Sequence, residues 1–313
     1  MPLLPRPPLA IALVTAVTLG TACGTGGEAP DGDTSPTAAA VPPPSASVPA
    51  SPSPTPAPSP SPSPTPLRAE APDPATPYED PAELAAALVA AEEHIRDPAI
   101  PADELTGWAW AQQSLYRQLT VRPEWHDQVL AAVPEALREP VRLNLRATVE
   151  LRKLTSPREE LPAWRIIPPP PAEELLDAYR TAADEFGIDW TYLAAIHLVE
   201  SRMGRIRGDS TAGAKGPMQF LPSTWDAYGE GDIEDPHDAI RAAARYLEDH
   251  GAPADMDAAI WAYNHSDRYV QAVKDHAAVM RADERTYLAY HAWQVYYRMT
   301  TGDIVLEEGF DNT

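Results

Sequence analysis

Cysteine and basic residues are scarce in this chain of 313 residues. One cysteine excludes an intramolecular disulfide, so the fold must be stable without such cross-links. Lysine and arginine together number 24 against 46 acidic residues, which gives a net charge of −22. Because phosphate neutralisation requires concentrated Lys and Arg, this balance disfavours nucleic-acid binding and electrostatic binding to anionic lipid.

Long hydrophobic runs are also scarce. An apolar run from Leu9 to Leu19 follows Arg6 and ends in small residues before Cys23. This run is too short to span a membrane and has the layout of an export signal, which we expect over residues 1–22. The stretch resembles a bacterial lipoprotein signal, which implies lipidation at Cys23 and anchoring at the outer face of the cell membrane. An ordinary secretory signal with an incidental cysteine is the alternative.

A Pro/Ser/Thr-rich linker is expected over residues 23–77. Seventeen prolines fall between Pro30 and Pro77, and such a composition buries too little apolar surface to offset the entropy of ordering. The remaining 236 residues are enough for one large domain or two small ones.

The pattern after the linker is helical, with apolar residues spaced three and four apart and almost no alternation. We therefore predict an all-α fold, with a helical N-terminal region at 78–167 and a second helical domain at 168–313, divided by the prolines that begin at Pro168. A short extended segment is expected at Ile304, Val305 and Leu306. The predicted helices are 81–94, 102–119, 123–133, 135–154, 172–186, 189–203, 222–228, 236–250, 256–264, 267–281 and 284–299.

Three motifs occur in order within the second helical set. They are Glu200-Ser201 at the end of an apolar helix, the glycine-containing run from Ser210 to Gln219, and Ala262-Tyr263-Asn264. Together they resemble the soluble lytic transglycosylases of the lysozyme-like superfamily, over roughly residues 172–280. The resemblance implies a lysozyme-like helical domain that acts on peptidoglycan.

The resemblance also implies a role for each motif residue. Glu200 would be the catalytic acid, and Tyr263 would hydrogen-bond or orient it. The expected substrate-binding residues are Ser201, Ser210, Met218, Gln219 and Asn264. Each also has a structural reading, such as a turn serine, a core methionine or tyrosine, or an asparagine that caps a helix.

The residues around Glu200 support its expected role independently. The preceding helix, from Trp190 to Val199, is almost wholly apolar. A carboxyl group at the edge of such a helix loses hydration, which raises its pKa and favours the neutral form that a general acid requires. The alternative is an ordinary solvated glutamate after a buried helix.

Metal chemistry is disfavoured by the sequence. His197 and Glu200 share a helix face, but no His-Glu-x-x-His occurs and no clustered Cys or His supplies further ligands. The acidic run from Asp232 to Asp238 lacks a calcium-loop pattern and suits helix capping, with Asp235 as the N-cap. We expect no metal and no cofactor.

The predicted reaction is cleavage of the β-1,4 bond between N-acetylmuramic acid and N-acetylglucosamine, giving 1,6-anhydro ends. The local charge between residues 202 and 215 is positive, so Arg205, Arg207 or Lys215 is expected to contact carboxylates of peptidoglycan. The rivals are a hydrolytic muramidase, with Asp209 or Asp226 as a second carboxylate, and a non-catalytic scaffold lipoprotein of the cell wall.

Overall fold

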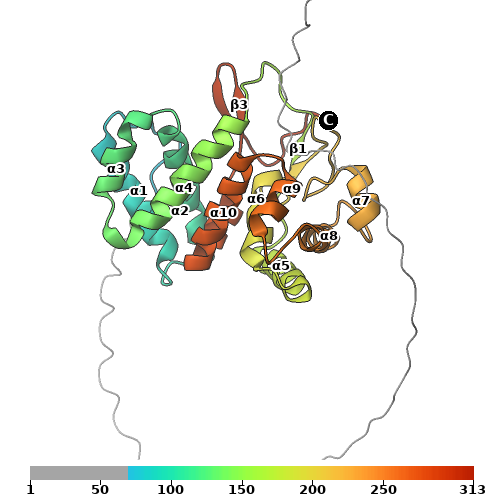
Figure 1. The fold of residues 1–313 in the computed structure, drawn as a ribbon. Helices are drawn as coiled ribbons and strands as arrows, with labels where there is room; N and C mark the ends of the chain where they lie inside the picture. Colours follow the sequence, from blue (N-terminus) through green and yellow to red (C-terminus); the bar gives the residue numbers. More distant parts are fainter. Residues whose placement is uncertain (1–69) are drawn as a thin grey trace, which may run out of the picture. The chain divides into compact units, whose positions relative to one another are not determined.

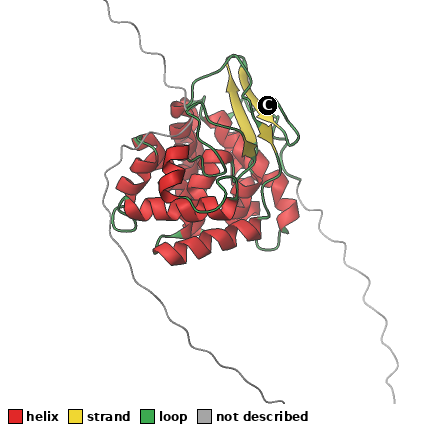
Figure 2. Cartoon of the chain, turned by 90° about the vertical axis from the view of Figure 1, so that its right-hand side faces the viewer, coloured by secondary structure: helices red, strands yellow, loops and turns green. Residues whose placement is uncertain are grey.

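Eleven α-helices make up most of residues 70–313, the part of the chain that the computed structural model describes (Figure 1). The predicted all-α class is confirmed, with two small two-stranded sheets as the exception (Figure 2). The predicted signal peptide, Cys23 and most of the predicted linker lie outside the described residues. The first helices are α1 (Pro81–Arg96), α2 (Ala102–Leu119), α3 (His126–Ala132) and α4 (Glu135–Leu154). The second set is α5 (Ala172–Phe186), α6 (Trp190–Ser201), α7 (Pro222–Tyr228), α8 (Pro236–Asp249), α9 (Met256–Tyr263), α10 (Asp267–Ala282) and α11 (Arg285–Ala292).

Helix starts follow the chemistry of their capping residues. Asp235 accepts hydrogen bonds from the backbone N–H groups of His237 and Asp238 at the start of α8, which satisfies donors that have no partner within the helix. The acidic run before α8 therefore serves helix capping, as the sequence predicts. Among residues 70–313, no helix is long and apolar enough to cross a membrane.

The last predicted helix is wrong in its second half. The helix α11 ends at Ala292, and β3 (Val295–Met299) follows and pairs antiparallel with β4 (Gly302–Leu306). Val295, Tyr296 and Tyr297 favour a pleated strand, and Gly302, with a φ of 129°, begins the return strand. The extended segment expected at 304–306 is confirmed as part of β4.

The helix α10 packs against α4 on one side and α6 on the other. Arg146 of α4 bonds the buried Asp275 of α10, with 2.7 Å between Nε and Oδ2. The N-terminal helices, whose role the sequence leaves open, thus support the helix that lies against α6. Residues 70–313 form one compact unit.

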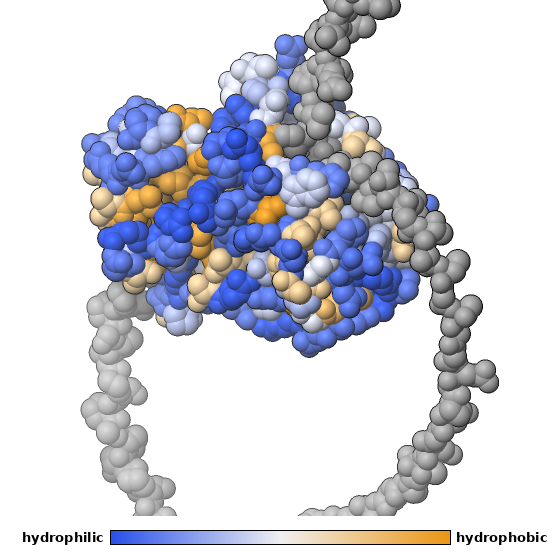
Figure 3. Space-filling view, in the orientation of Figure 1, coloured by the Kyte–Doolittle hydropathy of each residue, from blue (hydrophilic) through white to orange (hydrophobic). Residues whose placement is uncertain are grey.

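The segment between the two helical sets is tied to the rest by short strands. β1 (Arg165–Ile166) pairs antiparallel with β2 (Ile206–Arg207), and Arg158 forms a bridge to Met299 at the end of β3. The face seen in Figure 1 is mainly hydrophilic, as expected of a strongly charged chain, and hydrophobic residues gather over the N-terminal helices (Figure 3).

Candidate active site

Glu200 lies in the last turn of α6, whose side chains from Leu193 to Leu198 are fully buried. Asp189 caps the start of this helix, and Arg202 ends it in the left-handed conformation with a φ of 55°. The Glu200 side chain is only 9% exposed. Burial raises its pKa well above the ordinary value, because desolvation penalises the carboxylate. The protonated state expected of a general acid is therefore favoured.

The hydrogen-bond partner of Glu200 is Tyr269, on α10. The Tyr269 hydroxyl donates to Oε1 of Glu200 over 2.7 Å. This bond partly offsets the effect of burial on the pKa of Glu200, because the donor stabilises the ionised form. The expectation that Tyr263 makes this bond is wrong: its hydroxyl donates instead to the carbonyl oxygen of Met218 over 2.7 Å.

Buried side chains hold the glycine-containing loop in place next to the end of α6. The Ser201 hydroxyl donates to the carbonyl of Pro217 over 2.5 Å and accepts the N–H of Gly204 over 3.0 Å. Gly216 has a φ of 73°, and a Cβ there would lie 1.9 Å from the carbonyl oxygen of Ile233. The close approach of backbone that glycine permits is therefore required at this position.

Two expected substrate contacts are not available to a ligand. Ser201 and Met218 are both fully buried, Ser201 because its hydroxyl bonds the loop backbone and Met218 because its side chain packs in the hydrophobic core. Ser201 holds the loop by a hydrogen bond, and Met218, a residue of the loop, anchors it in the hydrophobic core. The alternative reading of Met218 as a core residue is the one that the structure supports.

The remaining motif residues are placed differently from one another. Ser210 lines the pocket beside Glu200, and its hydroxyl accepts the N–H of Ala214 over 2.9 Å, which stabilises the turn. Gln219 also lines the pocket and adopts a φ of 52°. Asn264 is buried at the C-cap of α9, as its capping alternative predicts, and is absent from the pocket lining.

The basic residues of the loop do not form an open positive surface. Arg205 is buried, pairs with Glu308, and donates to the carbonyl of His291. Arg207 donates to the backbone and side chain of Glu234. Lys215 pairs with Asp209 over 2.9 Å. Arg205 and Arg207 thus pair with acids far along the chain and Lys215 pairs with the nearby Asp209, so the loop carries little unpaired positive charge. Their contact with carboxylates of the substrate stays a prediction.

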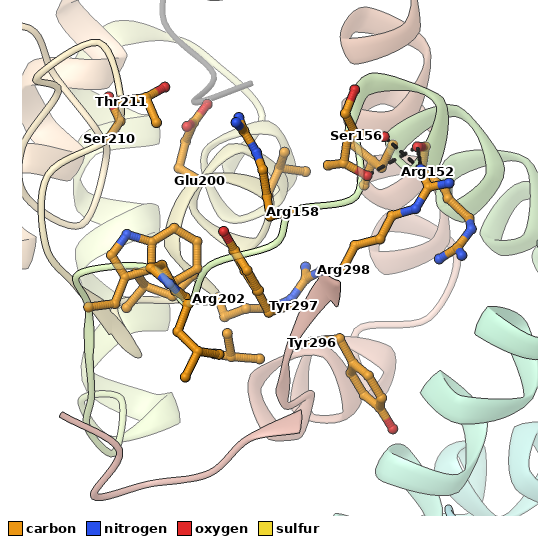
Figure 4. A pocket seen from close by; sticks show the side chains of 18 of the residues that line it. Arg152, Ser156, Arg158, Glu200, Arg202, Ser210, Thr211, Tyr296, Tyr297 and Arg298 are labelled. Carbon is orange, nitrogen blue, oxygen red and sulfur yellow. Dashed lines mark hydrogen bonds between the residues drawn. The ribbon is translucent and has the colours of Figure 1, made fainter. Parts of the chain in front are cut away.

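A pocket of about 630 Å³ opens beside Glu200. Figure 4 shows Glu200 with Ser210 and Thr211 to its left and the side chain of Arg158 to its right. The walls of this pocket come from α2, α4, the segment 155–164, the end of α6, the turn at 209–211, Gln219, α10 and β3. A volume of this size is typical of a ligand site, and the carboxyl group of Glu200 lies in its lining.

The two residues considered as metal ligands, His197 and Glu200, make hydrogen bonds to tyrosine hydroxyl groups instead. His197 is fully buried, and its Nδ1 lies 2.6 Å from the hydroxyl of Tyr179. Burial lowers the pKa of His197 to about 3. Within residues 70–313, no group of three or more His, Cys, Asp or Glu side chains could hold a metal ion.

Sequence reasoning missed Tyr269. Tyr269 lies on the apolar face of the predicted helix 267–281, with Val270 and Val273, so its burial could be predicted. A buried tyrosine needs a hydrogen-bond partner for its hydroxyl. Nothing in the local sequence identifies Glu200 as that partner.

Residues 177–284 match the family model described as the transglycosylase SLT domain. The match includes Glu200, the glycine-containing loop, Tyr263 and Tyr269, but not α1 to α4 or the β3–β4 hairpin. No curated protein and no solved structure matches the chain. The domain match agrees with a lysozyme-like helical fold and supports peptidoglycan lytic transglycosylase activity in general.

Proposed function

We propose that this protein is a peptidoglycan lytic transglycosylase in which Glu200 is the single catalytic carboxyl group. The observation that carries the proposal is the buried Glu200, bonded to Tyr269 and facing a pocket of ligand size. Its raised pKa keeps it protonated until it meets the substrate. The SLT domain match over the same segment supports peptidoglycan as the substrate.

The reaction needs no water. Glu200 donates its proton to the glycosidic oxygen between N-acetylmuramic acid and N-acetylglucosamine as that bond breaks. The acetamido group of the muramyl residue stabilises the cationic anomeric carbon. Glu200, now a carboxylate hydrogen-bonded by Tyr269, accepts the proton of the muramyl 6-hydroxyl while that oxygen bonds the anomeric carbon. The product is a 1,6-anhydromuramyl end, and Glu200 is protonated again.

The buried partners of the loop support this assignment. Ser201 and Tyr263 fix the carbonyls of Pro217 and Met218, so the following residue, Gln219, is held where it lines the pocket. A positioned amide suits the hydroxyl and acetamido groups of an amino sugar. Rigid support of this kind is what positioning of a substrate requires.

The test is mass spectrometry of purified peptidoglycan digested by the full chain. Lytic cleavage gives anhydro ends, whereas hydrolysis gives reducing ends that are heavier by one water. We expect anhydro ends from the wild type and no cleavage by Glu200→Gln, which keeps the shape and removes the acid. The matched control is Glu173→Gln, an exposed glutamate of α5, which should cleave normally.

Each rival has its own outcome in this experiment. Reducing ends would identify a hydrolytic muramidase and direct attention to Asp209, which lines the pocket but pairs with Lys215. Absence of any cleavage by the wild type would favour a scaffold protein. Normal cleavage by a folded Glu200→Gln variant would exclude Glu200 as the acid.

The site of action is part of the same proposal. The export signal and its cysteine support a lipoprotein anchored through Cys23 at the outer face of the membrane, with the Pro-rich linker reaching the cell wall. Metabolic labelling with an alkyne fatty acid should mark the wild type and not Cys23→Ala. Labelling of both would place the lipid elsewhere, and labelling of neither would leave an ordinary secreted protein.

A further inference from the structure

Most of the residues that line the pocket lie outside the matched SLT segment, residues 177–284. The segment 155–164 and the strand β3 form the walls that complete it, together with side chains of α2 and α4. These walls therefore form a part of the pocket that the matched domain does not contain.

The added walls are rich in arginine. Asp303 is the shared carboxylate partner of Arg117 and Arg152, so one negative charge faces two guanidinium groups. Two more arginines of these walls, Arg158 and Arg298, have no carboxylate partner among residues 70–313. The pocket is thus positively charged within a chain whose net charge is −22.

The acids of the pocket do not cancel this charge. Glu159 and Glu160 are exposed, so water screens them. Asp209 is paired with Lys215, and burial favours the neutral form of Glu200. An anionic group that enters the pocket would therefore meet uncompensated positive charge.

Arg158 is the arginine best placed to bind such a group. Its backbone N–H donates to the carbonyl of Arg298 over 2.9 Å, and its carbonyl accepts the N–H of Thr300 over 2.8 Å. The β hairpin thereby fixes its position. Its guanidinium group makes no hydrogen bond or ion pair with any other described residue, and its charge opposes the rise in the pKa of Tyr297 that burial causes. Figure 4 shows its side chain extending into the pocket that contains Glu200.

The other unpaired guanidinium of this wall has a supporting role. Arg298 donates through one nitrogen to the carbonyls of Arg152 and Thr155, at 3.2 and 2.6 Å. These bonds hold the start of the segment that carries Arg158. Arg298 therefore contributes positive charge and position, while Arg158 has its whole guanidinium group available for a bidentate contact.

We propose that Arg158, fixed on the β hairpin wall, binds a carboxylate of the peptidoglycan strand whose glycosidic bond lies at Glu200. This inference rests on the proposed function, because it identifies which chemical group of that substrate the pocket selects. The carboxylate can belong to the stem peptide or to the lactyl group of a peptide-free muramyl residue.

The first experiment compares substrates with the full chain. Peptide-bearing strands are used with their carboxylates free or converted to amides, and kcat/KM is measured for both. The wild type should prefer the free acid by about ten- to a hundredfold, the range of one charged hydrogen bond. Arg158→Gln should lose this preference, and Arg158→Lys should retain only part of it, because lysine keeps the charge but cannot make the bidentate contact. Arg180→Gln, which changes an exposed arginine of α5, should match the wild type.

Peptide-free strands distinguish the two sources of the carboxylate. If Arg158→Gln slows only the peptide-free strands, the ligand is the lactyl carboxylate, because peptide-bearing strands hold that group in an amide bond. If it slows only the peptide-bearing strands, the ligand is the stem peptide. An equal preference for free acid over amide in the wild type and Arg158→Gln, together with equal rates of the two proteins on peptide-free strands, would overturn the proposal.

A binding measurement separates this inference from the proposed function. Calorimetry with N-acetylmuramyl-L-alanyl-D-glutamate and its diamide requires no turnover. Preferential binding of the acid, lost in Arg158→Gln, would uphold the carboxylate site even if no glycan were cleaved. Cleavage that yields anhydro ends, with no such preference in either assay, would uphold the enzyme and exclude the site.

Discussion

The two tyrosines near Glu200 should respond differently to removal of their hydroxyl groups. Tyr269→Phe removes the 2.7 Å bond to Glu200, whereas Tyr263→Phe removes a bond to the carbonyl of Met218. The first change acts on the acid itself, and the second acts on the loop. The pair is matched, because both tyrosines are buried and both lose one oxygen atom.

The magnitude follows from the charge on Glu200 during the reaction. As the proton leaves, the carboxylate becomes the acceptor of a charge-assisted bond, and such bonds contribute about 1.5–3 kcal/mol. At about 1.4 kcal/mol for each tenfold, Tyr269→Phe should lower kcat/KM by roughly ten- to a hundredfold. The Tyr269 bond lowers the pKa of Glu200 against the effect of burial, so its loss raises that pKa further.

The pH dependence of kcat/KM shows the direction in which the pKa of Glu200 changes. Activity that needs protonated Glu200 falls as the pH rises through its pKa, so Tyr269→Phe should move the alkaline limb of kcat/KM toward higher pH. Tyr263→Phe should leave this limb in place and change KM, because the loop that carries Gln219 is loosened. The assay is initial-rate cleavage of soluble glycan strands from pH 4 to 10, with thermal unfolding as the check of folding. A moved limb in Tyr263→Phe and a fixed one in Tyr269→Phe would refute this reasoning.

Three further substitutions test the support of the site. Ser201→Ala leaves the buried carbonyl of Pro217 without its donor and should lower the free energy of unfolding in urea by about 1–3 kcal/mol; an unchanged midpoint would mean that the bond contributes nothing. Gly216→Ala forces a Cβ against the carbonyl of Ile233, and should lower both thermal stability and kcat/KM by displacing the loop, unless that loop is dispensable. Asp303→Asn should lower the free energy of unfolding at pH 7, since burial raises the pKa of Asp303 but the guanidinium groups of Arg117 and Arg152 outweigh it and leave that pKa lowered. A lowered pKa stabilises the fold above the ordinary value of 3.8, so the difference from wild type should vanish as the pH falls through the folded pKa; a gap that persists in acid would contradict the ion pairs.

Most helices and the position of Glu200 could be predicted, because their causes are local. An apolar run that ends in Glu200 fixes both the burial of α6 and the desolvation of its last carboxyl group. The bounds of α2, α4 and α5 follow equally from apolar spacing and from the prolines beside them. The strand β3 could not be predicted in this way, since its residues also fit a helix and only pairing with β4 decides between the two.

The charges around the loop show why counting within a window fails. Between residues 202 and 215 the basic residues outnumber the acids, but the partners of Arg205 and Arg207 are Glu308 and Glu234. These long-range ion pairs neutralise the positive charge that a count over residues 202–215 predicts. Arg158, by contrast, has no carboxylate partner among residues 70–313, although it lies in a segment where the sequence contains no recognisable motif.

Motif residues also divide by physical role in a way that their spacing does not reveal. Glu200, Ser210 and Gln219 line the pocket, whereas Ser201 and Tyr263 bond the backbone of the loop from inside. A motif marks positions where a particular side chain is needed, and a carbonyl that must be held restricts the choice as strongly as a substrate does. Which of the two a residue serves depends on the direction of its side chain, and that direction is set by how α6, α9 and α10 pack together.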